Sequence, residues 1–227
     1  MTKKSPDKTW NRIAQVYDFV LSTEERAYNQ LKKRIVNSID YDDKILELAA
    51  GYGTMALELC PHCRYVEATD ISREMIRKAE RLKTHSRYKN IDFRVSDVYD
   101  IDSDDNAYDV VIMSNTLHIL DVPDKAIQEI KRVLKPGGKL IIPNFIHKES
   151  LRSTILSHVI TTLGYPTKRR YSEQALTDYI ESHNFAIHKS VVINGTVPIA
   201  YIEALNDVSI ERAPRIHQIV VHSHYMP

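Results

Sequence analysis

Five short apolar segments recur along the first two thirds of the chain, and helical or turn-rich stretches separate them. After the second segment, Met75, Ile76, Ala79 and Leu82 follow one another at helical spacing, and Ser72 stands where a cap is expected. This alternation predicts repeated βα units. The predicted strands are KILELAA, RYVEATD, IDFRVS, YDVVIMS and KLIIPNF.

A second helix is predicted to begin near Asp121, with Pro123 in its first turn, and to end at KPGGK before the next strand. Strands that alternate with helices are joined by right-handed crossovers, which favours a parallel sheet. The pattern therefore predicts an α/β fold, a Rossmann-like, doubly wound and mostly parallel sheet with helices on both faces. Two later segments, AIHKSVVI and IAYIEAL, bring the predicted strands to seven.

The remaining segments suggest a division into a core domain and appendages. Residues 1–40 look helical and amphipathic and are expected to form an N-terminal helical cap, while 41–205 form the α/β domain. Residues 146–171 are expected to form a lid. For the tail, 206–227, a flexible end, an extra strand and an oligomer contact, as in a homodimer, all stay open.

The length and the charge of the chain limit the classes of function that it can have. A chain of 227 residues fits one α/β domain, and 31 basic against 30 acidic side chains argue against a dedicated nucleic-acid binder. The longest apolar runs are far shorter than the roughly 20 residues that span a bilayer, and the first ten residues lack the apolar centre of a signal peptide. We expect a cytoplasmic protein without stable membrane insertion.

The two cysteines, Cys60 and Cys63, form CPHC, a spacing that fits a redox pair or part of a metal site. No second cysteine pair completes a four-ligand zinc site, and Cys60 continues the apolar side of the preceding helix. Structural cysteines are therefore favoured and no metal is expected.

The stretch ILELAAGYGTMAL predicts a strand, a tight loop and a helix. Gly51 and Gly53 permit a sharp turn and close approach of the main chain to a ligand. Asp70 ends the next strand, 19 positions after Gly51, where a carboxylate can accept both hydroxyls of a ribose. A nicotinamide dinucleotide fits this pattern too, because GYGTMA satisfies a relaxed G-x-G-x-x-A.

Three features distinguish the two interpretations. Glu47 precedes the turn, where its charge repels a pyrophosphate and attracts an ammonium group. Asp97 follows the third strand, where a carboxylate can accept from an adenine amino group. After VLKPGGKLII the chain continues into two closing strands and not into a second mononucleotide-binding half.

Taken in order, ELAAGYG, ATDIS, SDVYDI, YDVVIMSNTLHIL and VLKPGGKLII resemble the class I S-adenosylmethionine-dependent methyltransferases, especially the small-molecule group of ubiquinone and menaquinone biosynthesis. The resemblance spans about residues 10–205. It implies S-adenosyl-L-methionine as cofactor and a final antiparallel strand. One departure is Ala49, which stands at the first glycine of the family's E-x-G-x-G-x-G pattern.

The resemblance also implies a set of cofactor contacts. The methionine part would lie beside Glu47 and the main chain of the glycine loop, Asp70 would hold the ribose, and Asp97 would take the adenine amino group. Each of these carboxylates has a structural alternative, since aspartates often cap the next segment. The implied cofactor contacts are Tyr17, Glu47, Ala49, Gly51, Gly53, Asp70, Ile71, Met75, Asp97, Val98, Ser114 and Asn115.

Methyl transfer from a sulfonium needs alignment of the acceptor and exclusion of water, and a base only for some acceptors. The candidate catalytic residues are His118, in NTLHIL, and Tyr17, which resembles an aromatic residue that a mobile N-terminal helix places over the cofactor. A packing role is the alternative for both. The basic run Lys168, Arg169, Arg170 either recognises an anion or is a solvated charge run.

The methyl acceptor is the least constrained part. SNTL lacks the N/D-P-P-Y/F signature of adenine or glutamine methylation, which favours a small-molecule acceptor: a quinone-like ring, a thiol or an amine. Two alternatives remain: a cofactor-binding protein that has lost catalysis and acts through partners, and a nicotinamide-dependent oxidoreductase.

Overall fold

The computed structural model describes residues 25–146 and 167–207. Most of the predicted cap with Tyr17, residues 147–166 of the predicted lid, and the tail from residue 208 onward lie outside these ranges. The described residues contain no helix long and apolar enough to cross a bilayer.

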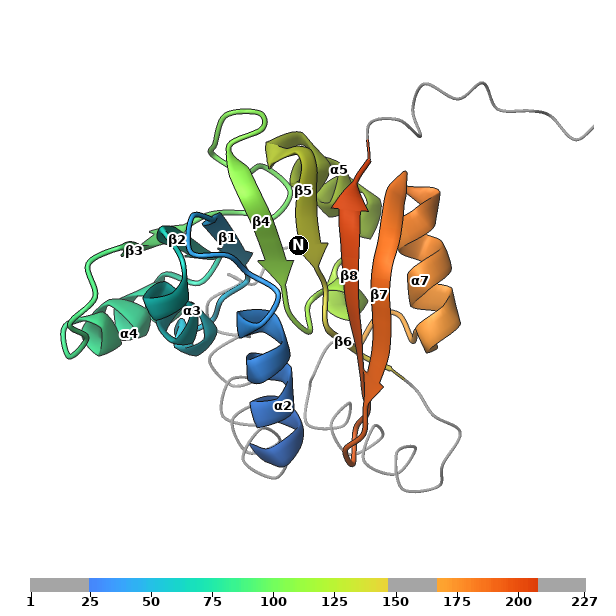
Figure 1. Ribbon diagram of the computed structural model, residues 1–227, viewed down its shortest axis with the longest axis horizontal. Helices are drawn as coiled ribbons and strands as arrows, with labels where there is room; N and C mark the ends of the chain where they lie inside the picture. The colour runs from blue at the N-terminus through green and yellow to red at the C-terminus, as the bar shows by residue number, and fades with distance from the viewer. Residues whose placement is uncertain (1–24, 147–166, 208–227) are drawn as a thin grey trace, which may run out of the picture.

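One eight-stranded sheet organises the protein, in the order β3-β2-β1-β4-β5-β8-β6, with β7 paired to the other edge of β8 (Figure 1). Strands β1 to β5 are mutually parallel, and β8 runs antiparallel to β5, β6 and β7. The mostly parallel sheet with one antiparallel strand is therefore confirmed. The strands are β1 (Lys44–Leu48), β2 (Tyr65–Asp70), β3 (Ile91–Val95), β4 (Tyr108–Met113), β5 (Leu134–Ile141), β6 (Asn144–Phe145), β7 (Phe185–Ile193) and β8 (Ile199–Asn206).

The eighth strand arises because KLIIPNF, predicted as one strand, is divided at Pro143. Proline has no N–H to donate to a ladder. On either side of the break the chain stays bonded to β8, since Ile142 N–H donates to the Ile202 carbonyl and Ile146 N–H to the Pro198 carbonyl. Strand β6 is thus a continuation of β5 along β8, and it places the side chain of Asn144 beyond the carboxyl end of β5.

The helices begin where their capping residues predict. Ser72 Oγ accepts from Met75 N–H, Ser172 Oγ accepts from Ala175 N–H, and Pro123 opens the helix after β4. The helices are α2 (Glu25–Val36), α3 (Thr54–Leu59), α4 (Arg73–Lys83), α5 (Pro123–Val133) and α7 (Glu173–Ser182), with the short 3-10 turns η1 (Cys60–His62) and η2 (Leu117–Ile119).

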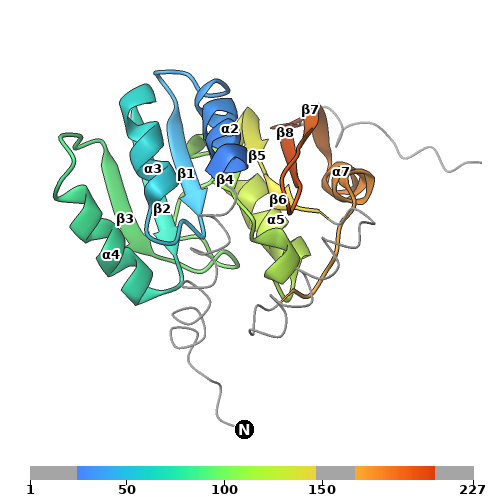
Figure 2. The ribbon, with the colours of Figure 1, turned by 90° about the horizontal axis from the view of Figure 1, so that it is seen from below.

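Alternating side chains of the strands feed two cores on opposite faces of the sheet. In β4, Ile112 packs in the core with α2, α3 and α4, whereas Val111 and Met113 pack in the core with α5 and α7. Figure 2 shows α2 and α5 on opposite sides of the strands. The predicted doubly wound arrangement is confirmed for β4, β5 and β8.

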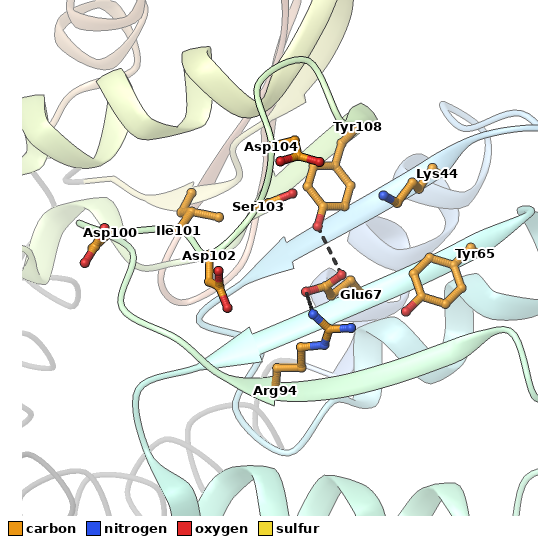
Figure 3. A pocket seen from close by; sticks show the side chains of 10 residues that line it. All are labelled: Lys44, Tyr65, Glu67, Arg94, Asp100, Ile101, Asp102, Ser103, Asp104 and Tyr108. Carbon is orange, nitrogen blue, oxygen red and sulfur yellow. Dashed lines mark hydrogen bonds and ion pairs between the residues drawn. The ribbon is translucent and has the colours of Figure 1, made fainter.

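Among the described residues, the second face of β2 and β3 carries no helix, because the 96–107 connection between β3 and β4 is one of the turn-rich stretches. This face instead borders a polar, solvent-open cavity of about 830 Å³ (Figure 3). Glu67 lies at its floor, where it accepts from Tyr108 Oη at 3.1 Å and pairs with Arg94 at 3.5 Å. Burial, together with the carboxylate of Glu67, raises the pKa of Tyr108 to about 12.

The two cysteine thiols are buried and free. Cys60 Sγ donates to the Leu57 carbonyl and Cys63 Sγ to the Leu59 carbonyl. Burial raises the pKa of both thiols, that of Cys63 to about 12. Because the thiolate is the reactive and metal-binding form, these groups are suited to packing.

Candidate functional site

The loop from Ala49 to Gly53 is a tight turn at the carboxyl end of β1. Ala49, Gly51 and Gly53 all have positive φ, at 53°, 57° and 75°. Gly53 N–H donates to the Ala50 carbonyl, and Ala50 N–H donates to the Thr69 carbonyl of β2. The left-handed backbone at Ala49 explains the glycine of the family pattern, and a non-glycine residue there costs about 1–3 kcal/mol of strain.

The two glycines of this loop have different reasons to be glycine. A Cβ added to Gly53 would lie 2.2 Å from Phe93 Cε1, whereas a Cβ added to Gly51 would meet nothing within 4 Å. Gly53 is therefore required by packing of the loop against β3. Gly51 leaves the main chain open to a ligand.

Asp70 ties this loop to the end of β2. Its Oδ2 accepts from Gly51 N–H at 2.8 Å, and its Oδ1 accepts from Ser72 N–H at 2.9 Å. Burial raises the pKa of Asp70, and these two N–H groups act in the opposite direction. A carboxylate offers about four acceptor positions, so both oxygens retain capacity for a further donor such as a hydroxyl.

Glu47 is a buried carboxylate at the end of β1, only 3% exposed. Burial raises its pKa to about 8; the Ala56 N–H lowers it and the charge of Asp70 raises it further. Among the described residues, Oε2 of Glu47 has no hydrogen-bond partner. A buried acid with one oxygen left unsatisfied is suited to a positively charged group of a ligand.

Two apolar side chains are exposed at the ends of β2 and β3, where the adenine is expected. Ile71 is 41% exposed and Val95 is 45% exposed. Asp97 Oδ1 accepts from Tyr99 N–H at 3.0 Å, so the capping role considered for this aspartate is present. Val98 follows Asp97 and is partly buried, and Met75 is buried on α4. Val95 was not among the predicted cofactor contacts, although its position as the last residue of a strand could have indicated it.

Ser114 and Asn115 lie at the carboxyl end of β4, next to β1. Ser114 Oγ is buried and has no hydrogen-bond partner within the described part of the chain. Asn115 has a positive φ of 49°, and its N–H donates to the Pro143 carbonyl at 2.7 Å. Its Nδ2 donates to Tyr28 Oη at 3.2 Å. Helix α2 therefore reaches this edge through Tyr28, a contact that sequence spacing does not reveal.

His118 lies in η2, three residues beyond Asn115, and is 4% exposed. Its Nδ1 lies 3.0 Å from Asn144 Oδ1, and its ring meets Phe145 edge-on with centroids 6.0 Å apart. Its carbonyl accepts from the N–H groups of Lys168 and Arg169, at 2.9 and 3.0 Å. Residues of β6 therefore contact the ring of His118, and the segment before α7 binds its carbonyl.

Two residues of the basic run before α7 make contacts within the protein. Lys168 pairs with Asp121, and the Arg169 guanidinium donates to the carbonyls of Leu120 and Asp121, the first at 2.7 Å. The sequence predicted either anion recognition or a solvated charge run. Lys168 and Arg169 instead bind the segment between η2 and α5. Arg170 is exposed.

These groups come together because the parallel strands β1, β2, β3 and β4 end at one edge of the sheet. The strand order reverses between β1 and β4, and ligands of open α/β sheets bind at such a switch point. The cavity of Figure 3 lies elsewhere, because Lys44, Tyr65 and Tyr108 stand at the opposite, amino-terminal ends of their strands. All predicted site residues except Tyr17, which lies outside the described residues, are at the carboxyl edge or on the elements that follow it.

Comparison with known proteins indicates the kind of protein. Residues 46–142 match a family described as a methyltransferase domain. The chain is 32% identical to a demethylmenaquinone methyltransferase from Paenarthrobacter aurescens, over 64% of this chain and 58% of the relative. It is 29% identical to a ubiquinone/menaquinone biosynthesis C-methyltransferase from Hydrogenovibrio crunogenus, over 60% of this chain and 56% of the relative.

Solved structures show the same fold. The magnesium protoporphyrin IX methyltransferase from Synechocystis, with bound SAH, superposes with a TM-score of 0.69 at 17% identity, over 87% of this chain and 94% of that one. The chain thus spans less than two thirds of the length of the two quinone-pathway relatives, and nearly the whole of this structural neighbour.

Proposed function

We propose that this chain, which belongs to the class I S-adenosylmethionine-dependent methyltransferases, transfers the methyl group of that cofactor to a small organic acceptor. The proposal rests on one observation: Glu47, Asp70 and Ser114 lie at the same edge of the sheet as Gly51, whose main chain is open to a ligand. Two of these side chains, Glu47 and Ser114, keep a buried oxygen without a partner among the described residues. Such atoms are expected to find partners in a ligand.

The residues at this edge fit S-adenosylmethionine part by part. Glu47 would take the ammonium group, and the main chain at Ala49 and Gly51 would line the methionine part. Asp70 would accept from the ribose hydroxyls through the acceptor capacity that Gly51 and Ser72 leave on its oxygens. The methyl group would then lie toward Ser114.

At the adenine end, Asp97 would accept from the adenine amino group and Val98 N–H would donate to the ring. Ile71 and Val95 would cover the two faces of the adenine, which accounts for large apolar side chains exposed at a polar edge. Met75 would support this end from α4. Tyr17 stays a proposed contact on the cofactor's outer side.

The bound cofactor supplies an electrophilic methyl group on a sulfonium, so the protein needs to align the acceptor in line with the S–CH3 bond and exclude water. A covalent intermediate on the protein is unnecessary. For an acceptor that must lose a proton, His118 is the proposed base, because its buried ring lies on the turn that follows Ser114 and Asn115.

The favoured acceptor is a quinone-like ring. This choice is supported by the names of the two relatives, which act in menaquinone and ubiquinone biosynthesis. The Phe145 ring beside His118 adds an aromatic surface on the acceptor side. Nucleic acid is not proposed as an acceptor, given a formal charge of +1.

A homodimer is proposed as the assembly, and light scattering of the purified chain tests it.

A methyl-transfer screen tests the proposal. Purified protein, freed of carried cofactor, is incubated with S-adenosylmethionine labelled in its methyl group and with three acceptor classes: reduced naphthoquinone rings lacking the ring methyl group, aryl thiols, and primary amines. Label is expected in the quinol. Label in thiol or amine would keep the methyltransferase and overturn the quinone assignment, and cofactor binding without transfer to any class would favour a protein that has lost catalysis.

A further inference from the structure

Asn144 has an amide whose two ends are fixed by different partners. Its Nδ2 donates to the Phe145 carbonyl at 2.9 Å, and its Oδ1 lies 3.0 Å from Nδ1 of His118. A carbonyl accepts and never donates, so the nitrogen end of the amide must face Phe145. The oxygen end therefore faces the imidazole.

This orientation determines the tautomer of His118. Because Asn144 Oδ1 can only accept, Nδ1 of His118 carries the hydrogen of the contact. In the neutral imidazole the lone pair is then on Nε2. An isolated histidine exchanges between both forms, whereas the contact with Asn144, which is buried at 0% exposure, favours the Nδ1–H form.

The surroundings keep both partners in place. Asn144 belongs to β6, whose position is set by pairing with Ala200 of β8. The main chain of His118 is fixed by the N–H groups of Lys168 and Arg169. Within residues 25–146 and 167–207, the charged groups next to the turn include Lys168, Asp121 and Arg169; the first two pair with each other and the guanidinium is bonded to carbonyls.

We infer that Asn144 is a positioning residue of the methyl transfer: it holds His118 as the Nδ1–H tautomer, so that Nε2 is the atom that takes the acceptor's proton. The inference rests on the proposed function. In the step on the favoured quinol, the O–H bond would break and its proton would go to Nε2, giving imidazolium. The oxygen's electron pair would act through the ring, so that a ring carbon bonds to the methyl carbon while the S–C bond to the cofactor breaks, leaving a neutral thioether. That ring carbon would then release its own proton and the oxygen would regain one from solvent, which restores the aromatic quinol.

Nitrogen NMR of the ¹⁵N-histidine-labelled protein tests the tautomer without any substrate. Ring nitrogens of the Nδ1–H and Nε2–H forms give distinct patterns, and His118→Gln identifies the His118 signals by their loss. The expected result at a pH where the ring is neutral is the Nδ1–H pattern for His118. An Nε2–H pattern, or rapid averaging of the two forms, would overturn the inference.

Two variants connect the tautomer to the reaction. Asn144→Ala is expected to release the Nδ1–H form and to lower kcat about 10–100-fold, the range known for the loss of a partner that orients a ligating imidazole, with the Kd of S-adenosylmethionine unchanged. Asn144→Asp places a carboxylate at Nδ1, which favours imidazolium. The acidic limb of the kcat profile should move upward by about 1–3 pH units.

Asn206→Ala is the matched control. Asn206 is also a buried asparagine, and its Nδ2 donates to the carbonyls of Leu134 and Lys135, at the far end of β8 from β6. It should lower the melting temperature and leave the His118 tautomer and the pH profile unchanged. An unshifted profile in folded Asn144→Asp would contradict the positioning role. Failure of the proposed function would appear separately, as absence of methyl transfer while the His118 tautomer stays as inferred.

Discussion

The cofactor half and the acceptor half of the candidate site are built in different ways. At the ends of β1 and β2 the main chain itself makes the site: Asp70 is fixed by N–H groups of Gly51 and Ser72, 19 and 2 residues away. At the end of β4 the side chains are fixed by distant partners. His118 meets Asn144, 26 residues on, and Asn115 meets Tyr28, 87 residues back.

This difference suggests a division of roles. A site made from local main-chain geometry keeps one shape for one cofactor, and a site made from long-range contacts can change with the elements that supply them. Substitutions at the β1 and β2 ends should therefore change cofactor affinity, and substitutions at the β4 end should change turnover. The predictions below test that separation, beginning with the largest effect.

His118→Ala should have the largest effect, and it should be on turnover. Loss of a general base typically costs about 10²–10⁴-fold in rate. With a hydroxyl acceptor, kcat should fall by that factor while the calorimetric Kd of S-adenosylmethionine stays at the parental value. Parental turnover across neutral pH would exclude His118 as a required base.

Asp70→Ala should have the largest effect on affinity. A hydrogen bond to a charged group contributes about 1.5–3 kcal/mol, so loss of the ribose acceptor should weaken S-adenosylmethionine binding about 10–150-fold. Asp92→Ala is the control, because Asp92 is an aspartate of the neighbouring strand that bonds to Tyr65 and Lys83 instead. An unchanged Kd in folded Asp70→Ala would remove this residue from the site.

The glycine pair separates packing from binding inside one loop. Gly53→Ala drives a Cβ into Phe93 at a positive φ, and it should cost about 2–4 kcal/mol of unfolding free energy. Gly51→Ala has room, so it should cost only about 1–2 kcal/mol of stability. The added methyl group should nevertheless weaken cofactor binding. Denaturant titration and calorimetry on both variants measure the two effects, and equal stability losses would refute the assignment.

Glu47 predicts a linkage between stability and pH. Its folded pKa of about 8 lies above its ordinary value of 4.5, so the fold binds this proton more tightly than the unfolded chain. Its contribution to stability is fully present below pH 4.5 and is lost as pH rises through about 8. Glu47→Gln should remove that slope from the pH dependence of the unfolding free energy.

The same group links binding to protons. An ammonium group beside Glu47 favours the carboxylate, so cofactor binding at neutral pH should release up to one proton from Glu47. Calorimetry in buffers of different ionisation enthalpy measures the release. The same proton release from Glu47→Gln as from the parent protein would contradict the assignment.

The contrast between the halves also explains what the sequence could reveal. Glu47, Gly51 and Asp70 could be proposed from the sequence because their roles depend on spacing within one βα unit, which the chain displays directly. Ser72 and Ser172 were recognisable as caps for the same reason. Asp97 could be proposed in the same way, and its capping alternative is present in the contact with Tyr99 N–H.

At the acceptor half, Ser114, Asn115 and His118 could be proposed from the sequence, but their contacts could not, because these depend on how separate elements meet. No local sequence pattern predicts the contact between Asn144 and His118 or the one between Tyr28 and Asn115. The same holds for the hydrogen bond from Arg169 to the carbonyl of Leu120, 49 residues away. The division of KLIIPNF at Pro143 was visible in the residues, yet its consequence for Asn144 appears only once β8 is placed beside it.

The most direct test of the account is a calorimetric titration of the purified, cofactor-free protein with S-adenosylmethionine, S-adenosylhomocysteine and NADH. Binding of the first two with one site per chain, and no heat from NADH, is the predicted result. Binding of NADH, or of none of the three, would contradict the claim that the edge formed by Glu47, Gly51 and Asp70 is an S-adenosylmethionine site.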